Sequence, residues 1–148
     1  DQVAGVQRNF VKSQTNYFLH AYILIRRDGS ALAIEKSYKD FKELGNAVED
    51  EVTRRLLPEA LDMYNTGSPV YFGVIRVDSQ GISVLQKNGP KTLPWNEYNG
   101  YKVYDGRLKI KKRDSRSVWE TILILQIPNL CVLLALIQYI TNGQRPQQ

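Results

Sequence analysis

Six basic residues lie within one short stretch of the second half of the chain and are the first candidates for chemistry: Arg107, Lys109, Lys111, Lys112, Arg113 and Arg116. Over 107–112 charged and apolar residues alternate, so Leu108 and Ile110 are predicted to face inward on a strand, opposite to Arg107, Lys109 and Lys111. Such cations can contact anionic lipid headgroups, phosphate or a nucleic-acid backbone. The same pattern is typical of a solvated strand face, on which lysines discourage edge-to-edge aggregation.

Tyrosines recur beside this basic cluster, at Tyr98, Tyr101 and Tyr104, and we expect them to form a partner surface. The edge of a curved sheet exposes backbone donors and acceptors, so a segment of another protein or a second copy can add to it as a further strand. In a nucleic-acid-binding protein the same rings would stack on bases. The tyrosines therefore predict a protein partner or a homo-oligomer, with nucleic acid as an alternative.

Residues that usually carry catalysis or hold metals are scarce. His20 is the only histidine and Cys131 the only cysteine, so neither can build a metal cage with a second residue of its kind. The run Glu49-Asp50-Glu51 falls on a predicted helix, where consecutive side chains point in different directions, and we interpret it as solvated surface. The sequence has no glycine-rich loop for phosphates. We therefore expect no enzymatic activity, no cofactor and no metal.

The net charge of +5 belongs to the second half of the chain. Up to Ser68 nine Lys and Arg stand against ten Asp and Glu, a balance of −1, whereas from Pro69 onward eleven stand against five, a balance of +6. This asymmetry permits an acidic partner such as phosphate, anionic lipid or nucleic acid, without choosing among them.

The most apolar stretch, over 122–140, has nineteen residues without a charge, just long enough to span a membrane. Pro128 interrupts it, because proline lacks a backbone donor and disfavours helical angles at Ile127. The sequence therefore predicts a strand over 118–127 followed by a buried helix over 130–140. Four residues of this helix are expected to face the core: Leu130, Leu133, Leu134 and Ile137.

The first half is predicted to contain strands followed by one long helix. Strand patterns cover 2–10 and 15–27, and Asp28-Gly29 predicts a hairpin into a further strand over 31–35. Over 38–64 apolar residues recur every three or four positions, which is typical of an amphipathic helix, with Ser37 as its N-cap. Its apolar face would comprise Phe41, Leu44, Val48, Val52, Leu56 and Ala60.

The second half is predicted to contain short strands joined by tight turns. Strands are expected over 70–77 and 82–86, with a turn over 87–91, and Asp105-Gly106 predicts a hairpin between 99–104 and 107–112. These strands favour an α+β fold in which a strongly curved antiparallel sheet is closed by the C-terminal helix. Strands, an Asp-Gly hairpin and a helix thus occur twice, which predicts two units, 1–66 and 67–148, the first being a partial copy.

The order and length of the elements over 70–140 resemble those of pleckstrin-homology-like (PH-like) domains. Four short motifs resemble the recurring marks of an uncharacterised bacterial domain family with PH-like repeats: Tyr71-Phe72-Gly73, Gly81-Ile82, Leu93-Pro94-Trp95-Asn96-Glu97 and Ile127-Pro128-Asn129. The stretch from Arg26-Arg27-Asp28-Gly29 to Leu56-Leu57-Pro58 resembles the preceding half of that family. The resemblance implies a fold and no activity.

The resemblance also bears on lipid binding. Phosphoinositide-binding PH domains usually carry Lys and Arg on their first two strands and the loop between them, whereas 70–86 offers only Arg76. We therefore expect a non-enzymatic PH-like interaction or scaffold module of the bacterial cytoplasm that binds a protein partner or itself. The alternatives are peripheral binding of anionic lipid or phosphate through Arg107–Arg116, at the inner membrane surface, and nucleic-acid binding.

Overall fold

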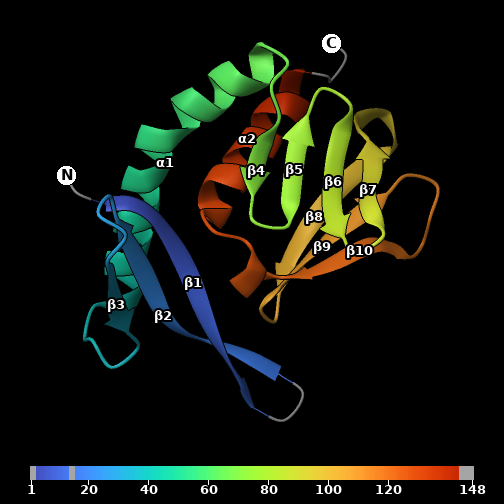
Figure 1. The fold of residues 1–148 in the computed structure, drawn as a ribbon. Helices are drawn as coiled ribbons and strands as arrows, with labels where there is room; N and C mark the ends of the chain where they lie inside the picture. Colours follow the sequence, from blue (N-terminus) through green and yellow to red (C-terminus); the bar gives the residue numbers. More distant parts are fainter. Residues whose placement is uncertain (1–2, 14–15, 144–148) are drawn as a thin grey trace.

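The computed structural model describes residues 3–13 and 16–143, which form an α+β fold with three small antiparallel sheets and two helices (Figure 1). The first sheet has the order β1-β2-β3, the second β4-β5-β6-β7 and the third β10-β9-β8. The strands are β1 (Val3–Ser13), β2 (Asn16–Arg26), β3 (Ala31–Glu35), β4 (Val70–Phe72), β5 (Ile75–Asp78), β6 (Gly81–Gln86), β7 (Gly89–Pro94), β8 (Tyr98–Tyr104), β9 (Arg107–Lys112) and β10 (Val118–Leu123). The helices are α1 (Phe41–Asn65) and α2 (Leu130–Gly143), and short 3-10 turns cover Trp95–Glu97 and Ile124–Gln126.

Both Asp-Gly pairs form hairpins where the sequence predicts them. Asp28-Gly29 lies between β2 and β3, and Asp105-Gly106 lies between β8 and β9. In the second pair both turn residues have positive φ, 53° for Asp105 and 69° for Gly106, as a tight two-residue hairpin requires. A tight turn depends mainly on the residues that form it, so it can be predicted from the Asp-Gly pair itself.

The stretch over 70–77 is two strands, so the prediction of one strand was wrong. Phe72 lies opposite Ile75 in an antiparallel pair of β4 and β5, and the chain reverses through Gly73 and Val74. Gly73 has a φ of 61°, a conformation that glycine adopts without steric cost. The turn is hard to predict from the sequence because apolar residues continue on both sides of it and Gly73 is the only turn-forming residue there.

The turn predicted over 87–91 is shorter in the structure. Lys87 and Asn88 form it, and β7 starts at Gly89. Pro90 is therefore inside a strand, which it can occupy because β7 lies at the edge of its sheet and needs a ladder donor on one side only.

The expected single curved sheet is divided into two sheets that share one core. The inward faces of β5 and β9 carry Ile75, Leu108 and Ile110, which are fully buried in one hydrophobic cluster with Leu133 and Leu136 of α2. In the described part of the chain no strand pairing joins β7 to β8. A 3-10 turn separates these two strands, so the ladder stops there.

The apolar stretch over 122–140 divides into a strand and a helix, as the proline predicts. β10 ends at Leu123, earlier than expected, and α2 begins at Leu130. Of the four residues expected in the core, Leu130, Leu133 and Ile137 are buried, and Leu134 is half-buried. Neither helix of the described chain is long and apolar enough to cross a membrane.

The long helix starts later and faces differently from the prediction. Asp40 is its N-cap residue and makes no side-chain cap hydrogen bond, so the capping role expected for Ser37 was wrong. Leu44 is 43 % exposed although its spacing predicts burial. Gly45 is buried instead, because the ring of Tyr22 on β2 lies where a side chain at Gly45 would be. The face of α1 is thus set by a close approach to the first sheet.

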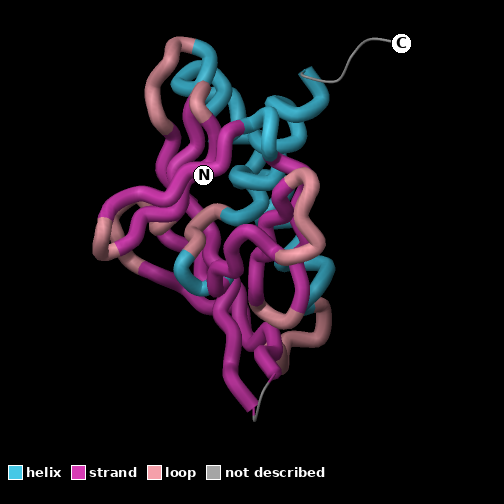
Figure 2. The backbone as a smooth tube through the Cα atoms, turned by 90° about the vertical axis from the view of Figure 1, so that its right-hand side faces the viewer, coloured by secondary structure: helices cyan, strands magenta, loops and turns pink. Residues whose placement is uncertain are grey.

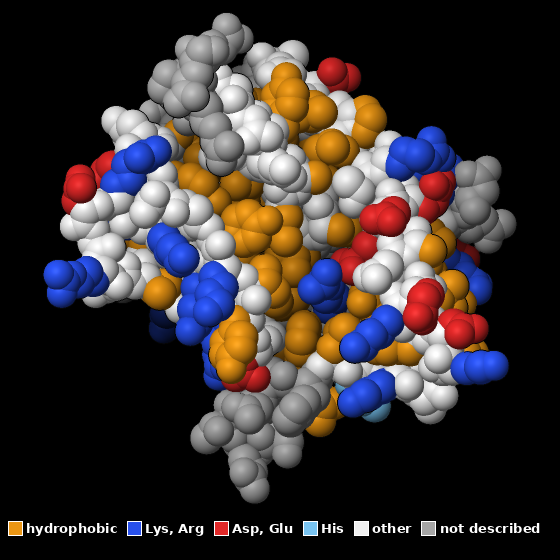
Figure 3. All heavy atoms as spheres, turned by 180° about the vertical axis from the view of Figure 1, so that it is seen from behind, with side chains coloured by type: hydrophobic (Ala, Val, Ile, Leu, Met, Phe, Trp, Pro, Cys, Tyr) orange, Lys and Arg blue, Asp and Glu red, His pale blue; other side chains and the backbone are white. Residues whose placement is uncertain are grey.

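The two helices lie next to each other on one side of the molecule (Figures 1 and 2). α1 also packs on β1, β3 and β4, so it joins the first sheet to the rest of the chain. Seen from behind, apolar side chains run down the middle of the molecule between two flanks that carry charged side chains (Figure 3).

Two of the short motifs meet at one joint beside the first sheet. Asn129 has a φ of 55°, its backbone N–H donates to the Val6 carbonyl at 2.9 Å, and its side-chain oxygen accepts from the buried Val6 N–H at 2.8 Å. On the other side of the joint, a Cβ on Gly73 would lie 2.8 Å from Cδ of Pro128. Tyr71-Phe72-Gly73 and Ile127-Pro128-Asn129 therefore fasten β4, β1 and the start of α2 together.

Replacing Asn129 with alanine is expected to lower the free energy of unfolding by about 2–3 kcal/mol. The change removes the side-chain hydrogen bond to the buried Val6 N–H, and it places alanine at a positive φ, which asparagine tolerates better. Asn129→Gly keeps the backbone conformation and is expected to cost about 1–2 kcal/mol. Urea unfolding of the wild type and the two variants measures the contribution of the hydrogen bond and that of the backbone strain. Equal stability of wild type and Asn129→Ala would contradict a structural role for this joint.

Candidate functional site

An open groove of about 900 Å³ lies between the start of β8 and the second half of α2. Tyr98, Asn99, Gly100 and Tyr101 line it from β8, and the turn before β8 adds Trp95 and Asn96. The opposite side is formed by Ile137, Gln138, Thr141 and Asn142 of α2. Arg113, which follows β9, is the only charged residue among those that line the groove.

One wall of this groove is a sheet edge. In the order β10-β9-β8, β8 is the last strand, and within the described chain it pairs only with β9. Its pairing is irregular between Tyr98 and Tyr101, where Asn99 and Gly100 lie, and Gly100 has a φ of 104°. An edge strand of this kind presents backbone N–H and C=O groups that a further strand can use.

Two aromatic residues pack against each other at the base of the groove. Trp95 and Tyr98 pack edge to face with their ring centroids 5.5 Å apart, and the indole N–H of Trp95 donates to the Asp78 carbonyl at 2.8 Å. Each is only 6 % exposed. Burial raises the pKa of the Tyr98 phenol above its ordinary value, so the hydroxyl stays neutral.

The structure separates the three tyrosines proposed as one partner surface. Tyr98 is buried, as just described. Tyr101 lies opposite Ile110, on the core-facing side of the sheet, where it reaches the groove. Tyr104 lies opposite Arg107 on the other side and is 61 % exposed. Residues directly opposite in a sheet share a face, so Tyr101 and Tyr104 point to opposite faces and cannot contact one flat partner together.

The basic cluster is likewise spread over different surfaces. Leu108 and Ile110 are buried as predicted, which places Arg107, Lys109 and Lys111 on the outer face of β9. Lys112 projects to the other side and lies 3.4 Å from Glu97. Arg113 borders the groove, and Arg116 is exposed in the loop before β10. The six cations therefore do not form one binding patch.

The outer face of the third sheet gains a residue that the sequence reasoning missed. Lys102 of β8 lies directly opposite Lys109 of β9. The ammonium groups lie 5.2 Å (Lys102) and 6.0 Å (Lys109) from the ring centroid of Tyr104. Their numbers differ by seven, so only the register of the Asp105-Gly106 hairpin reveals the pair, and counting back from that turn could have found it.

The prediction that Glu49 is solvated was wrong. Glu49 is 6 % exposed, and its carboxylate accepts two hydrogen bonds from the Arg8 guanidinium, at 3.0 and 3.1 Å. The pair joins α1 to β1 beside a hollow of about 570 Å³ that α2 also lines. Glu51, in contrast, is exposed and pairs with Arg54 one helical turn away. Neighbouring helical positions thus have opposite environments.

The one cysteine and the one histidine of the chain lie in different environments. Cys131 lines the same hollow as Arg8, and burial raises the pKa of its thiol, which disfavours the nucleophilic thiolate. His20 is exposed on β2. Among the residues that the structure describes, no group of three or more His, Cys, Asp or Glu side chains could hold a metal ion.

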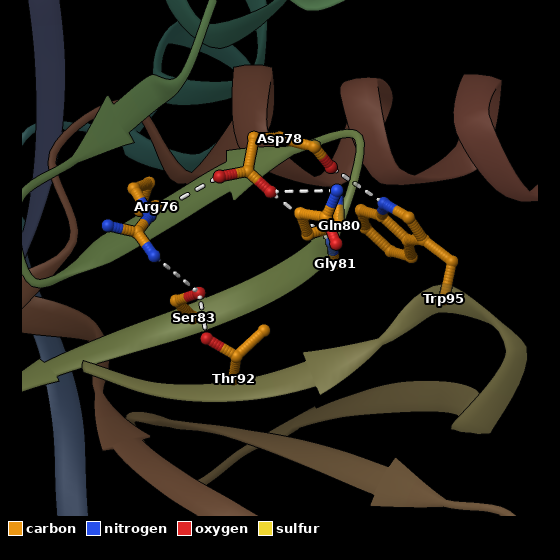
Figure 4. Close-up of polar contacts among 7 residues, drawn as sticks. All are labelled: Arg76, Asp78, Gln80, Gly81, Ser83, Thr92 and Trp95. Carbon is orange, nitrogen blue, oxygen red and sulfur yellow. Dashed lines mark hydrogen bonds and ion pairs between the residues drawn. The ribbon is translucent and has the colours of Figure 1, made fainter. Parts of the chain in front are cut away.

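Arg76, the one cation over 70–86, is engaged in a structural network (Figure 4). Its Nε lies 3.4 Å from a carboxylate oxygen of Asp78, and its Nη2 donates to the Ser83 hydroxyl at 3.3 Å. Asp78 also accepts from the backbone N–H groups of Gln80 and Gly81 in the β5–β6 turn. These contacts hold Arg76 along the sheet and stabilise the β5–β6 turn that leads into Gly81-Ile82.

A family model described as a family of unknown function (DUF6585) matches residues 3–146 of the chain. No curated protein and no solved structure matches it. The motifs that carried the resemblance to an uncharacterised domain family thus fall within one matched region, and each of them makes packing or hydrogen-bonding contacts within the fold.

Proposed function

The chain belongs to this family of unknown function, DUF6585, and we propose that it is a non-enzymatic, PH-like interaction module that binds an extended segment of a partner protein. The groove beside β8 is the binding site in this proposal. Seven antiparallel strands, β4 to β10, followed by α2 support the PH-like assignment.

The observation that carries the proposal is the position of the free edge of β8 along an open groove. A segment entering the groove can hydrogen-bond to β8 as an added strand while its other side packs on α2. Main-chain hydrogen bonds of this kind give affinity to any extended chain, and the side chains around them give selectivity.

The lining of the groove indicates what kind of segment fits. Trp95, Tyr98 and Ile137 supply an apolar base, and the walls carry side-chain amides and a hydroxyl, which can donate or accept. Arg113 is exposed and is the only charge in the lining. A segment with an acidic side chain beside Arg113 is therefore favoured over a basic one by charge complementarity.

A random peptide library displayed on phage and selected on the immobilised chain tests the proposal. We expect enrichment of extended, acidic peptides whose addition shifts the backbone amide signals of 98–101 and 137–142 in a ¹⁵N NMR titration. Arg113→Glu should raise the Kd at least about tenfold, because it places like charges face to face. Arg116→Glu makes the same charge change outside the groove lining and should leave the Kd unchanged.

A second variant tests the groove independently of charge. Asn142 is exposed on the last turns of α2, and Asn142→Trp would fill the space in front of β8 without touching the core. Binding should then be lost while the unfolding midpoint is kept. The proposal is wrong if no peptide is enriched, or if the selected peptides bind Asn142→Trp as well as wild type.

A further inference from the structure

We infer that the outer face of the third sheet carries a separate binding site for a phosphate-type dianion, formed by Lys102, Lys109 and Thr121. The register of the strands places these residues in one row. Lys102 on β8 is opposite Lys109 on β9, and Lys109 is opposite Thr121 on β10. Directly opposite residues share a face, so two ammonium groups and a hydroxyl project from the same side.

The two lysines form an unfavourable pair in the absence of an anion. Like charges that face each other across a sheet destabilise it. Within the described chain neither ammonium group has a carboxylate at ion-pair distance, and the ring of Tyr104 lies near both. The π face of a tyrosine compensates a cation only in part.

Several other cations of the second and third sheets have carboxylate partners. Lys112 lies 3.4 Å from Glu97, and Lys91 lies 3.0 Å from Glu120. Arg107, in the next row of the same face, is 2.7 Å from the Asp105 carboxylate. The row of Lys102 and Lys109 differs from these pairs because it places two lysines directly opposite each other, and the described chain gives neither of them a carboxylate at ion-pair distance.

The chemistry of the row indicates its ligand. Two ammonium groups and one hydroxyl provide three hydrogen-bond donor groups. The two positive charges match a phosphate monoester, which carries a charge of about −1.5 to −2 at neutral pH. A carboxylate or a phosphodiester has one negative charge and would leave one lysine unbalanced. The ligand is a phosphate monoester group, free or on a membrane lipid headgroup.

This site lies apart from the groove. Lys102 and Lys109 point away from the core, whereas Tyr101 and Arg113 border the groove beside α2. The two proposals therefore use different residues and can fail separately.

A ¹⁵N NMR titration of the full chain with inorganic phosphate, at constant ionic strength set by chloride, tests the inference. We expect saturable shifts around 102, 109 and 121, and at least a tenfold rise of the Kd in Lys102→Gln/Lys109→Gln. Lys42→Gln/Lys87→Gln removes the same charge at two exposed lysines elsewhere and should bind as wild type. Thr121→Val keeps the shape and should weaken binding less than the double lysine variant does.

Vesicles distinguish the two sources of the ligand. Sedimentation with phosphatidylcholine vesicles that contain phosphatidate, which has a monoester headgroup, supports a lipid ligand, provided that phosphatidylserine vesicles do not bind. Phosphate titration without vesicle binding supports a soluble ligand. Absence of saturable shifts, or equal loss in the two double variants, overturns the inference, since the latter shows only diffuse charge attraction.

Discussion

Replacing Glu49 with alanine is expected to lower the free energy of unfolding by about 3 kcal/mol. The change leaves the Arg8 guanidinium, with a side chain only 26 % exposed, without its carboxylate, and breaking a buried ion pair by removing one partner typically costs about 3–5 kcal/mol. Partial exposure of Arg8 places the effect at the low end. Urea unfolding followed by circular dichroism measures the loss.

The helix supplies a matched control for this experiment. Glu51 is two positions away and forms an exposed pair with Arg54, so Glu51→Ala should leave the unfolding midpoint unchanged. A double variant, Arg8→Met with Glu49→Leu, removes both charges and should recover much of the stability, because apolar residues can replace a buried pair. If Glu49→Ala and Glu51→Ala behaved alike, the Arg8–Glu49 contact would not stabilise the protein.

Gly73→Ala is expected to be about as damaging, also near 3 kcal/mol. The new Cβ would strain a residue with a φ of 61°, which costs about 1–2 kcal/mol, and would push against the Gln126 carbonyl and Pro128. Forcing extra atoms into a packed site adds about 1–3 kcal/mol. Thermal and urea unfolding should show the loss with secondary structure retained under native conditions.

Gly67→Ala separates the two causes. Gly67 has a φ of 85°, and a Cβ there would meet no atom within 4 Å, so that variant carries the backbone strain alone. We expect it to lose about 1 kcal/mol. Equal losses at the two positions would mean that the contact between the β4–β5 turn and the start of α2 contributes nothing.

The features that could be predicted from the sequence are those that depend on neighbouring residues. Asp28-Gly29 and Asp105-Gly106 make hairpins, and Pro128 lies between a strand and a helix, because turn and helix geometry is decided over a few positions. The turn at Gly73 was missed because the apolar run continues on both sides of it. The division into units 1–66 and 67–148, with the first a partial copy, stays a prediction.

The candidate sites could be predicted only in part, since they depend on contacts between distant positions. The basic residues of β9 and the tyrosines of β8 were visible, but the groove needs α2 beside β8, and the burial of Glu49 needs Arg8, which lies forty-one positions earlier. Similarly, Lys102 becomes a candidate site residue only because it lies opposite Lys109 across the sheet. Composition and spacing carry no information about the groove or the Arg8–Glu49 pair, whereas the Lys102–Lys109 pair could have been found by counting back from the hairpin turn.

The helix α2 connects β1 to the groove, although no residue of β1 lines the groove. The helix begins next to Asn129, which is fastened to Val6, and its far end forms the groove wall. Fourteen helical residues measure about 21 Å, so a tilt of about 10° at the fastened end would move the other end by about 4 Å. The hydrogen bonds between Asn129 and Val6 therefore fix the start of α2 against β1, and the direction of the helix from that point determines where its far end stands relative to β8.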